Sequence, residues 1–390
     1  MWRLICFVLA SLSAISCGLD QIGEGVRSDS DGVWKGPSLG KDYSDVCCVT
    51  AFEYPEGKDW RKEQDDTDVS LVMLAEGSPL LRMDVGEEWK VSSDPQRQRI
   101  ENGHLYTDFT DGSTTVVRKD GSLLCEWSGA EEVTALTETG GYLHTLSIPD
   151  AGEGFVYRID GQPVVERHSG NLYQYFGKDE EGVCFFFSQQ TVTVQGTEER
   201  YYHVSGGKVN RIEMTEGAEA VMDIKLHDGQ VCILAAMQDR VALVCGDVMR
   251  PLPGTDPCQM ISCAFVESEE LAAVLKSTDD KGGITTRLMW FRDGLILNYR
   301  TSFQVASVWL DKDGYHLLIN PSEGVQGHIA SVGKKVLLPE GYAALSKTCM
   351  CRKDSTLYVG LSSSEGGPPL IWSERKTDTL RINGYISGLQ

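Results

Sequence analysis

The chain of 390 residues is poor in basic side chains: 36 Lys and Arg stand against 57 Asp and Glu, a formal net charge of −21 at pH 7. A field of this sign repels the phosphates of nucleic acids, so we expect no nucleic-acid partner. Beyond the first residues the sequence also lacks any apolar run of the ~20 residues that a membrane-spanning helix needs. We therefore expect the mature chain not to be an integral membrane protein.

Glycine, in contrast, is abundant, with 41 residues, while 41% of the chain is apolar and 24% is charged. The last two values are ordinary for a packed globular protein, which excludes wholesale disorder and a collagen-like repeat. The length alone allows one large domain or two to three smaller ones.

The first residues have the order of an export signal. Met1–Arg3 carries one positive charge, Leu4–Leu12 is apolar, and small residues precede Cys17. Ala14-Ile15-Ser16-Cys17 resembles the lipobox of bacterial lipoproteins, which implies cleavage before Cys17 and acylation of that Cys. The alternative is an ordinary secretory signal followed by an incidental Cys. The resemblance predicts a lipid-anchored protein of the bacterial cell envelope, facing the periplasm or the outside.

The mature chain divides at about residue 45. Residues 17–44 are polar, rich in Gly and without periodicity, so we interpret residues 1–16 as signal peptide and residues 17–44 as a flexible tether from the lipid. From residue 45 to residue 390 the pattern is one of short apolar runs with period-2 alternation, separated by turn residues. This pattern predicts a single all-β domain built from hairpins.

The hairpins recur at a regular interval. In six hairpins, the turn glycines of successive hairpins are about 42 residues apart on average. These hairpins are Gly112–Trp127, Phe155–Val165, Tyr201–Ile212, Val241–Leu252, Leu288–Tyr299 and Ile329–Leu338. A further apolar strand precedes each hairpin. Candidate innermost strands come before these, at Val133–Leu136, Leu172–Phe176, Val221–Leu226, Ile261–Val266, Val305–Leu310 and Ala343–Cys349.

Four strands per repeat of this length predict a β-propeller of seven or eight blades, with a pair of tandem β-sandwiches as the alternative. Ser268–Lys276 has helical composition, but the repeat places it on a strand. If the ring closes, strands near Val46–Phe52 must lie beside those of Ala343–Ile382. We then expect loss of Asn383–Gln390 to be tolerated better than loss of Leu380–Ile382. The repeats resemble those of exported bacterial β-propeller proteins but carry no specific blade motif, so the resemblance implies no activity.

Ten cysteines remain besides Cys6 and Cys17, and we interpret most of them as buried thiols. They are Cys47, Cys48, Cys125, Cys184, Cys232, Cys245, Cys258, Cys263, Cys349 and Cys351. If Gln238-Asp239 is a turn, Cys232 and Cys245 oppose each other on adjacent strands. We expect that pair to be two reduced thiols, because directly opposed positions strain a disulfide.

No motif marks a metal or cofactor site. The seven His are scattered through the repeats and are interpreted as strand residues; they are His104, His144, His168, His203, His227, His316 and His328. Three acidic groups are interpreted as solvated turns: Asp65-Asp66-x-Asp68, Asp179-Glu180-Glu181 and Asp279-Asp280. Aromatic residues gather at residues 173–176, 185–187 and 201–202, where core filling is favoured over a surface that stacks sugar rings.

Three functions remain open. The sequence favours a membrane-anchored binding module for a protein or glycan partner. The alternatives are an enzyme that acts on envelope or extracellular glycans, with acid and base groups meeting at the central channel, and an inert structural subunit. The catalytic residues of such an enzyme cannot be named from the sequence.

Replacing Cys17 by Ser should release the protein from the membrane fraction into the soluble fraction, because acyl chains on this residue are the expected anchor. Incorporation of labelled fatty acid should stop as well. The variant Cys47→Ser serves as the control and should stay in the membrane fraction. Unchanged partitioning of the Cys17→Ser variant would contradict the lipoprotein interpretation.

Overall fold

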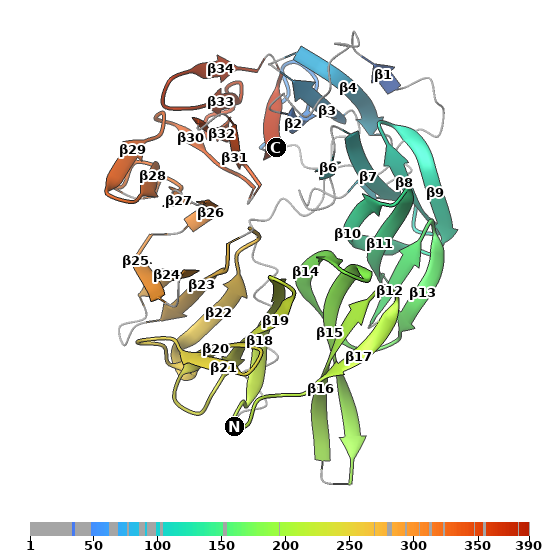
Figure 1. The fold of residues 1–390 in the computed structure, drawn as a ribbon. Coiled ribbons are helices and arrows are strands. Elements are labelled where there is room, and N and C mark those ends of the chain that lie inside the picture. The colour runs from blue at the N-terminus through green and yellow to red at the C-terminus, as the bar shows by residue number, and fades with distance from the viewer. Residues whose placement is uncertain are drawn as a thin grey trace.

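The computed structural model is a ring of eight small antiparallel β-sheets around a central axis, an eight-bladed β-propeller (Figure 1). The predicted propeller is confirmed with eight blades, and the alternative of tandem sandwiches is wrong. The structure describes residues 33–35, 48–61, 69–75, 78–85, 90–91, 99–101 and 104–389, except for short gaps at 151–153, 195, 269, 279–282, 293–294, 304, 312–313, 323, 347, 354–355 and 381. Among these residues, no helix is long and apolar enough to cross a membrane.

Five consecutive blades have four strands each, which follow chain order from the axis to the rim. Blade 3 comprises β10 (Glu131–Thr139), β11 (Tyr142–Pro149), β12 (Phe155–Ile159) and β13 (Gln162–Arg167). Blade 4 comprises β14 (Asn171–Asp179), β15 (Gly182–Thr193), β16 (Gly196–Ser205) and β17 (Lys208–Ile212). Blade 5 comprises β18 (Ala220–His227), β19 (Gln230–Ala236), β20 (Val241–Cys245) and β21 (Val248–Pro251). Blade 6 comprises β22 (Met260–Phe265), β23 (Ala272–Thr278), β24 (Ile284–Arg292) and β25 (Leu295–Thr301), and it follows a 3₁₀ turn at Pro257–Gln259. Blade 7 comprises β26 (Val305–Asp311), β27 (Gly314–Ile319), β28 (His328–Ser331) and β29 (Lys334–Leu337).

The other three blades have five strands. Blade 1 takes β35 (Gly384–Leu389) from the C-terminus, then β2 (Cys48–Glu53), β3 (Val69–Ala75), β4 (Ser78–Val85) and, at the rim, β1 (Val33–Lys35). In blade 2, β5 (Lys90–Val91) and β6 (Arg99–Glu101) both pair with β7 (His104–Thr110), which β8 (Thr114–Lys119) and β9 (Ser122–Ser128) follow. In blade 8, β30 (Tyr342–Ala343) and β31 (Met350–Lys353) both pair with β32 (Thr356–Ser363), ahead of β33 (Leu370–Trp372) and β34 (Thr377–Thr379). Strand β1 lies within the predicted tether, and the rest of that segment is outside the described residues.

The outer hairpins turn where the sequence predicts. In β8–β9 the turn residues Asp120 and Gly121 have φ of 50° and 77°, and Asp160 and Gly161 of β12–β13 have φ of 48° and 77°. Positive φ at both central residues is the geometry that Asp-Gly turns adopt, and its twist suits a tight hairpin. The predicted turn at Asp293-Gly294 lies outside the described residues.

Innermost strands follow the prediction in five blades and depart from it in blade 8. There two short strands replace one, because β30 ends at Ala343 and β31 begins at Met350. Between them Ser346 Oγ accepts the backbone N–H of Thr348 and turns the chain. In blades 3 to 7 each innermost strand also carries a bulge against its neighbour, which the sequence pattern does not reveal. Bulges of this kind bend a strand and increase its twist. The segment Ser268–Lys276 leads into strand β23, as the repeat predicted.

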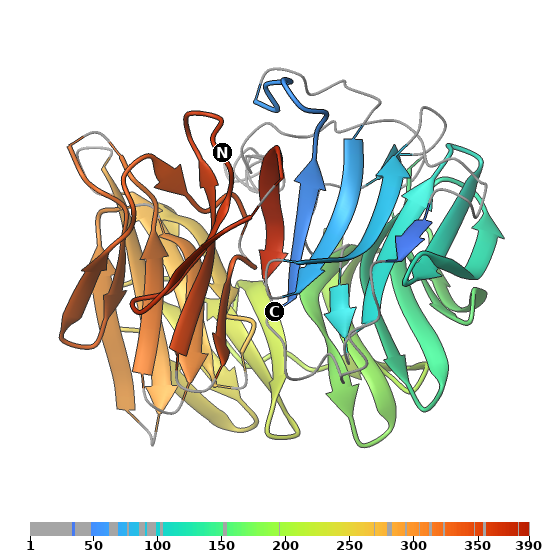
Figure 2. The ribbon, with the colours of Figure 1, turned by 90° about the horizontal axis from the view of Figure 1, so that it is seen from above.

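The ring closes between the two ends of the chain. Strand β35 pairs antiparallel with β2, with Phe52 opposite Tyr385 and Glu53 opposite Gly384, and Figure 2 shows the two strands side by side. Closure at the termini is confirmed, but the closing strand is Gly384–Leu389, whereas β34 ends at Thr379, before Leu380–Ile382. The expectation that loss of Asn383–Gln390 is tolerated better than loss of Leu380–Ile382 therefore loses its basis. The stretch contains two Gly and a Ser, which are weak strand formers. A Cβ on Gly384 would overlap the carbonyl of Phe52, so this close approach requires glycine.

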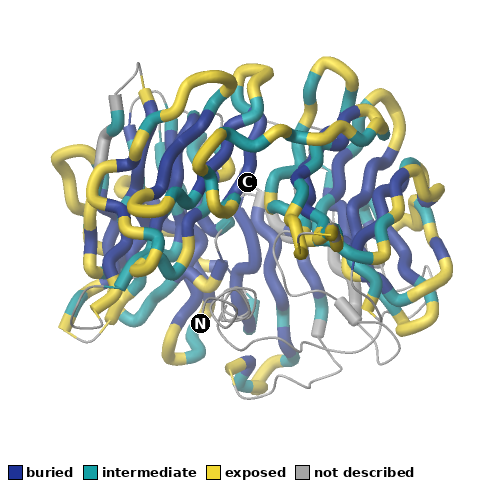
Figure 3. Tube along the Cα trace, turned by 90° about the horizontal axis from the view of Figure 1, so that it is seen from below, coloured by how far each residue is buried: buried dark blue, intermediate teal, exposed yellow. Residues whose placement is uncertain are grey.

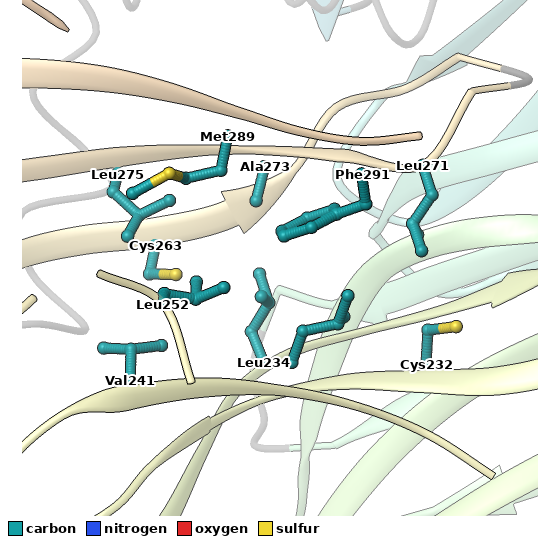
Figure 4. Close-up of a cluster of buried hydrophobic side chains, with 11 residues drawn as sticks. Cys232, Leu234, Val241, Leu252, Cys263, Leu271, Ala273, Leu275, Met289 and Phe291 are labelled. Carbon is teal, nitrogen blue, oxygen red and sulfur yellow. The ribbon is translucent and has the colours of Figure 1, made fainter. Parts of the chain in front are cut away.

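The core lies between blades rather than in one central mass. Figure 3 shows burial running along the strands and exposure at the turns. Figure 4 shows the contact of blades 5 and 6, where side chains from both sheets meet: Cys232, Leu234, Val241, Leu252, Cys263, Leu271, Ala273, Leu275, Met289 and Phe291. Clusters of the same kind lie at the described contacts from blade 2 with blade 3 round to blade 8 with blade 1, so blades 3 to 8 each depend on both neighbours.

A chain that ends at Asn383 should lose most of its stability. The truncation removes Tyr385, Ile386 and Leu389, which are all buried and together contribute roughly 5–9 kcal/mol. That is comparable to the net stability of a folded domain. Circular dichroism during heating and limited proteolysis would measure the effect, and a chain that lacks only Gln390 is the control. Equal melting temperatures for the two truncations would contradict the closure.

Candidate functional site

One hairpin extends beyond its own blade. Strand β14 pairs with β15 only as far as Ser188, and β17 pairs with β16 only as far as Tyr201. Residues 189–194 and 196–200 therefore form a two-stranded segment, here called the ribbon, that projects past the outline of the ring at the bottom of Figure 1. It is the continuation of the two middle strands of blade 4.

Side chains at its base fix the direction of the ribbon. Glu199 accepts hydrogen bonds from Ser188 Oγ at 2.7 Å and from Tyr201 Oη at 3.2 Å. Ser188 is buried, so the carboxylate of Glu199 ties the ribbon to the last buried residues of both strands. The register continues without a bulge from Gln189 opposite Arg200 to Thr193 opposite Gly196.

The two edges of the ribbon differ in charge. The β16 edge carries Glu198, Glu199 and Arg200, and Glu198 forms ion pairs with Arg200 at 3.0 Å and with Arg211 at 3.6 Å. The β15 edge reads Gln-Gln-Thr-Val and carries no charge. At the end of the ribbon Val192 and Val194 are 85% and 105% exposed. The ribbon thus presents apolar side chains and an uncharged strand edge to solvent.

The aromatic residues of blade 4 fill the core, as the sequence favoured. Phe185 and Phe187 pack towards blade 3, and Phe186 and Tyr201 pack towards blade 5. All four are buried. They are therefore not available as a surface on which sugar rings could stack.

The seven histidines are spread over five blades and each has a polar group beside it, so they form no ring around the axis. The nearest polar partners are Asp120 for His104, Tyr157 for His144, Glu166 for His168, Asp179 for His203, Asp228 for His227, Ser331 for His316 and the Gln326 carbonyl for His328. Of Asp179-Glu180-Glu181, the last two residues form an exposed turn between β14 and β15, as predicted, whereas Asp179 ends β14 and its side chain is only 13% exposed. The other two acidic groups, residues 65–68 and 279–280, lie outside the described residues.

The predicted opposition of Cys232 and Cys245 is confirmed, but the predicted reduced state is wrong, since the two form a disulfide. Their Cα atoms are 4.3 Å apart. A Cα–Cα distance this short is typical of a non-hydrogen-bonded pair in an antiparallel sheet. In such a pair the two side chains approach each other most closely. The register of the two strands can be predicted from the sequence, but whether a given pair is hydrogen-bonded or non-hydrogen-bonded cannot. Cys184, Cys263, Cys349 and Cys351 are free and buried, Cys125 is half-buried and Cys258 is exposed.

The enzyme alternative needs a carboxyl group with a shifted pKa that can reach a substrate. Burial raises the pKa of Asp223, on the innermost strand β18, from its ordinary 3.8 to about 6. Both carboxylate oxygens are engaged, however, because Oδ1 accepts from the N–H of Ile224 at 2.9 Å and Oδ2 from that of Phe265 at 2.7 Å. Phe265 belongs to blade 6, so Asp223 joins two blades.

No family model matches the chain, and no curated protein matches it in sequence. Among solved structures it is similar to a Mycobacterium tuberculosis puromycin-hydrolyzing peptidase, with a TM-score of 0.45 and 12% identity over 93% of this chain and 57% of that one. It is also similar to a putative 6-phosphogluconolactonase from Bacteroides uniformis, with a TM-score of 0.28 and 11% identity over 89% and 99% of the chains. The chain thus spans little more than half the length of the peptidase. Likeness at these levels says nothing of this chain's activity.

The variant Asp223→Asn should flatten the pH dependence of stability between about pH 4 and pH 6. The pKa of Asp223 is higher in the folded state than in the unfolded state, so only the folded state holds its proton in this range. The free energy of unfolding should therefore fall as pH rises through it, by up to about 3 kcal/mol, and the contribution is lost above pH 6. Urea unfolding at a series of pH values would measure this. Asp247→Asn, at an exposed carboxyl, is the control and should keep the wild-type slope.

Proposed function

We propose that the chain is a lipid-anchored β-propeller of the bacterial cell envelope that binds a protein partner through the ribbon. The observation that carries the proposal is the projection of residues 189–194 and 196–200 with Val192 and Val194 exposed at its end. Val192 and Val194 place two apolar side chains at the end of a projecting element, where a partner molecule can cover them. The anchor rests on the sequence of residues 14–17 alone.

Protein is favoured over glycan by the chemistry of the ribbon. Its exposed apolar residues are aliphatic, whereas sugar rings stack on aromatic faces. None of the aromatic residues of blade 4 is classed as exposed, since four are buried and Tyr173, Tyr175, Phe176 and Tyr202 are partly buried against the core. The β15 edge, Gln189–Val192, offers backbone N–H and C=O groups that an extended segment of a partner can pair with. Strand addition of this kind uses main-chain hydrogen bonds for affinity and side chains for specificity.

Insertion of the ribbon into lipid is disfavoured. A membrane-surface element combines basic residues with large apolar ones, and the ribbon has two valines and a single Arg, which pairs with Glu198. The acidic net charge of the whole chain repels an anionic bilayer. Attachment to the membrane is therefore assigned to Cys17 and partner binding to the ribbon.

A photo-cross-linking amino acid at position 194 should give one discrete protein adduct in the native envelope. The same amino acid at position 332 should not, although Val332 is also an exposed valine, at 63%, in the turn between β28 and β29 of blade 7. The double variant Val192→Asp with Val194→Asp should abolish that adduct and leave the melting temperature unchanged. Identical adducts from positions 194 and 332, or adducts with lipid alone, would overturn the proposal.

A further inference from the structure

Three strands of blade 4 bring an acid, a thiol and an imidazole together. Asp179 ends β14, Cys184 lies on β15 and His203 lies on β16. One carboxylate oxygen, Cys184 Sγ and one imidazole nitrogen all lie within 4.8 Å of one another. The cluster faces blade 5, against which Cys184 packs.

Local structure fixes the position of each group. Asp179 Oδ1 accepts the N–H of Glu181 at 2.9 Å and that of Gly182 at 3.1 Å, so the turn holds the carboxylate and leaves Oδ2 directed at the cluster. The imidazole of His203 stacks on Phe186, with ring centroids 4.8 Å apart. Nε2 of His203 then lies 3.4 Å from Asp179 Oδ2. This separation is close to that of two ligands on one tetrahedral metal ion, about 3.3 Å for bonds of about 2.0 Å.

Two polar atoms at this place are buried without a hydrogen-bond partner. They are Nε2 of His203, which lies 3.4 Å from Asp179 Oδ2 without forming a hydrogen bond, and Oγ of Ser205, a residue that is only 4% exposed. Ser205 stands directly opposite Cys184 and shares its face of the sheet. Buried polar groups in native proteins are almost always satisfied, so each such atom requires a partner.

The same position in other blades is satisfied. The position compared is the second residue after the turn that joins the first and second strands, together with the residue opposite it on the third strand. In blade 5 that pair is Cys232 and Cys245, which form a disulfide. In blade 7 it is His316 and Ser331, whose Nδ1 and Oγ are 2.7 Å apart. In blade 4 it is Cys184 and Ser205, and the serine hydroxyl has no partner. Among these three blades, only blade 4 leaves a polar atom of this pair without a hydrogen bond.

We propose that Asp179, Cys184 and His203 bind a divalent transition-metal ion, zinc by preference, with the Ser205 hydroxyl beside the fourth position. A thiolate, an imidazole and a carboxylate are the ligands that zinc takes in proteins, and tetrahedral coordination suits a site of three protein ligands. The proposal is independent of the docking role of the ribbon.

Binding exchanges one proton for the ion. At neutral pH a cysteine without metal is a protonated thiol and an imidazole is largely neutral, and Cys184 is buried at the contact with blade 5. When zinc binds, the S–H bond breaks, a Zn–S bond forms and the proton leaves to water, while His203 offers its lone pair without losing a proton. No oxidant or reductant is needed. The side chains of Asp179 and His203 are 13% and 17% exposed, which gives the ion a path from solvent.

The test uses the untagged, full-length mature protein, stripped with a chelator and titrated with Co²⁺ and Zn²⁺. The wild type should take up about one cobalt per chain with a thiolate-to-cobalt absorption band, and zinc should displace it. Cys184→Ser and His203→Gln should each weaken binding about 100-fold or more, and Ser205→Ala about 10-fold, the effect of losing an outer partner.

Two variants control for folding and for other thiols. Cys263→Ser removes a buried thiol at the contact of blades 5 and 6, and His144→Gln removes a buried imidazole of blade 3; both should bind cobalt as the wild type does. Circular dichroism should show that all variants fold. If Cys184→Ser does not fold, His203→Gln still decides the test, because His203 is partly exposed and its replacement disturbs the core less. Absence of the thiolate band in the wild type, or an undiminished band in His203→Gln, would overturn the proposal.

Discussion

The pairing of β35 with β2 is the constraint on which the rest of the molecule depends. A blade in a closed ring buries both faces against neighbours, whereas an open ring would expose one face at each end and an unpaired strand edge. Closure joins segments separated by more than 330 residues, Thr50 and Ser387 among them, whose hydroxyl oxygens are 3.1 Å apart. Such a contact forms late and at high entropic cost, so its side chains must pack closely to offset that cost. All six residues of β35 are buried.

Closure also gives every blade the same surroundings, so equivalent positions can diverge chemically without altering the fold. The pair two residues beyond the first turn is a disulfide in blade 5 and a hydrogen-bonded His–Ser pair in blade 7. In blade 4 it is Cys184 with the unpartnered Ser205. A repeat architecture thus supplies a fixed frame in which one substitution on each of three strands assembles a site.

Most of the fold could be predicted from local sequence patterns, whereas contacts between residues distant in the chain could not. Turn residues such as Asp120-Gly121 act within a few positions, so hairpins, repeat length and the register of Cys232 with Cys245 could be predicted from the sequence. The closing strand could not, because Gly384 is required by the approach of Phe52 and Gly388 by that of Thr50, both residues distant in the chain. The cluster of Asp179, Cys184 and His203 was missed for the same reason. Its members are 5 and 19 residues apart in sequence, which matches no short metal-binding motif.

The two sites assigned to blade 4 share the same two strands, and this sharing has a mechanical consequence. Phe185 and Phe187 hold β15 against blade 3, while Phe186 and Cys184 hold its other face against blade 5. A ribbon that continues from strands clamped on both faces loses little conformational entropy when a partner binds, so more of the contact energy is retained as affinity. An ion that links β14, β15 and β16 beneath the ribbon would add a third restraint, at the end of the hairpin opposite the exposed valines. The long hairpin, with the exposed valines at one end and the cluster of Asp179, Cys184 and His203 at the other, would then be one rigid element.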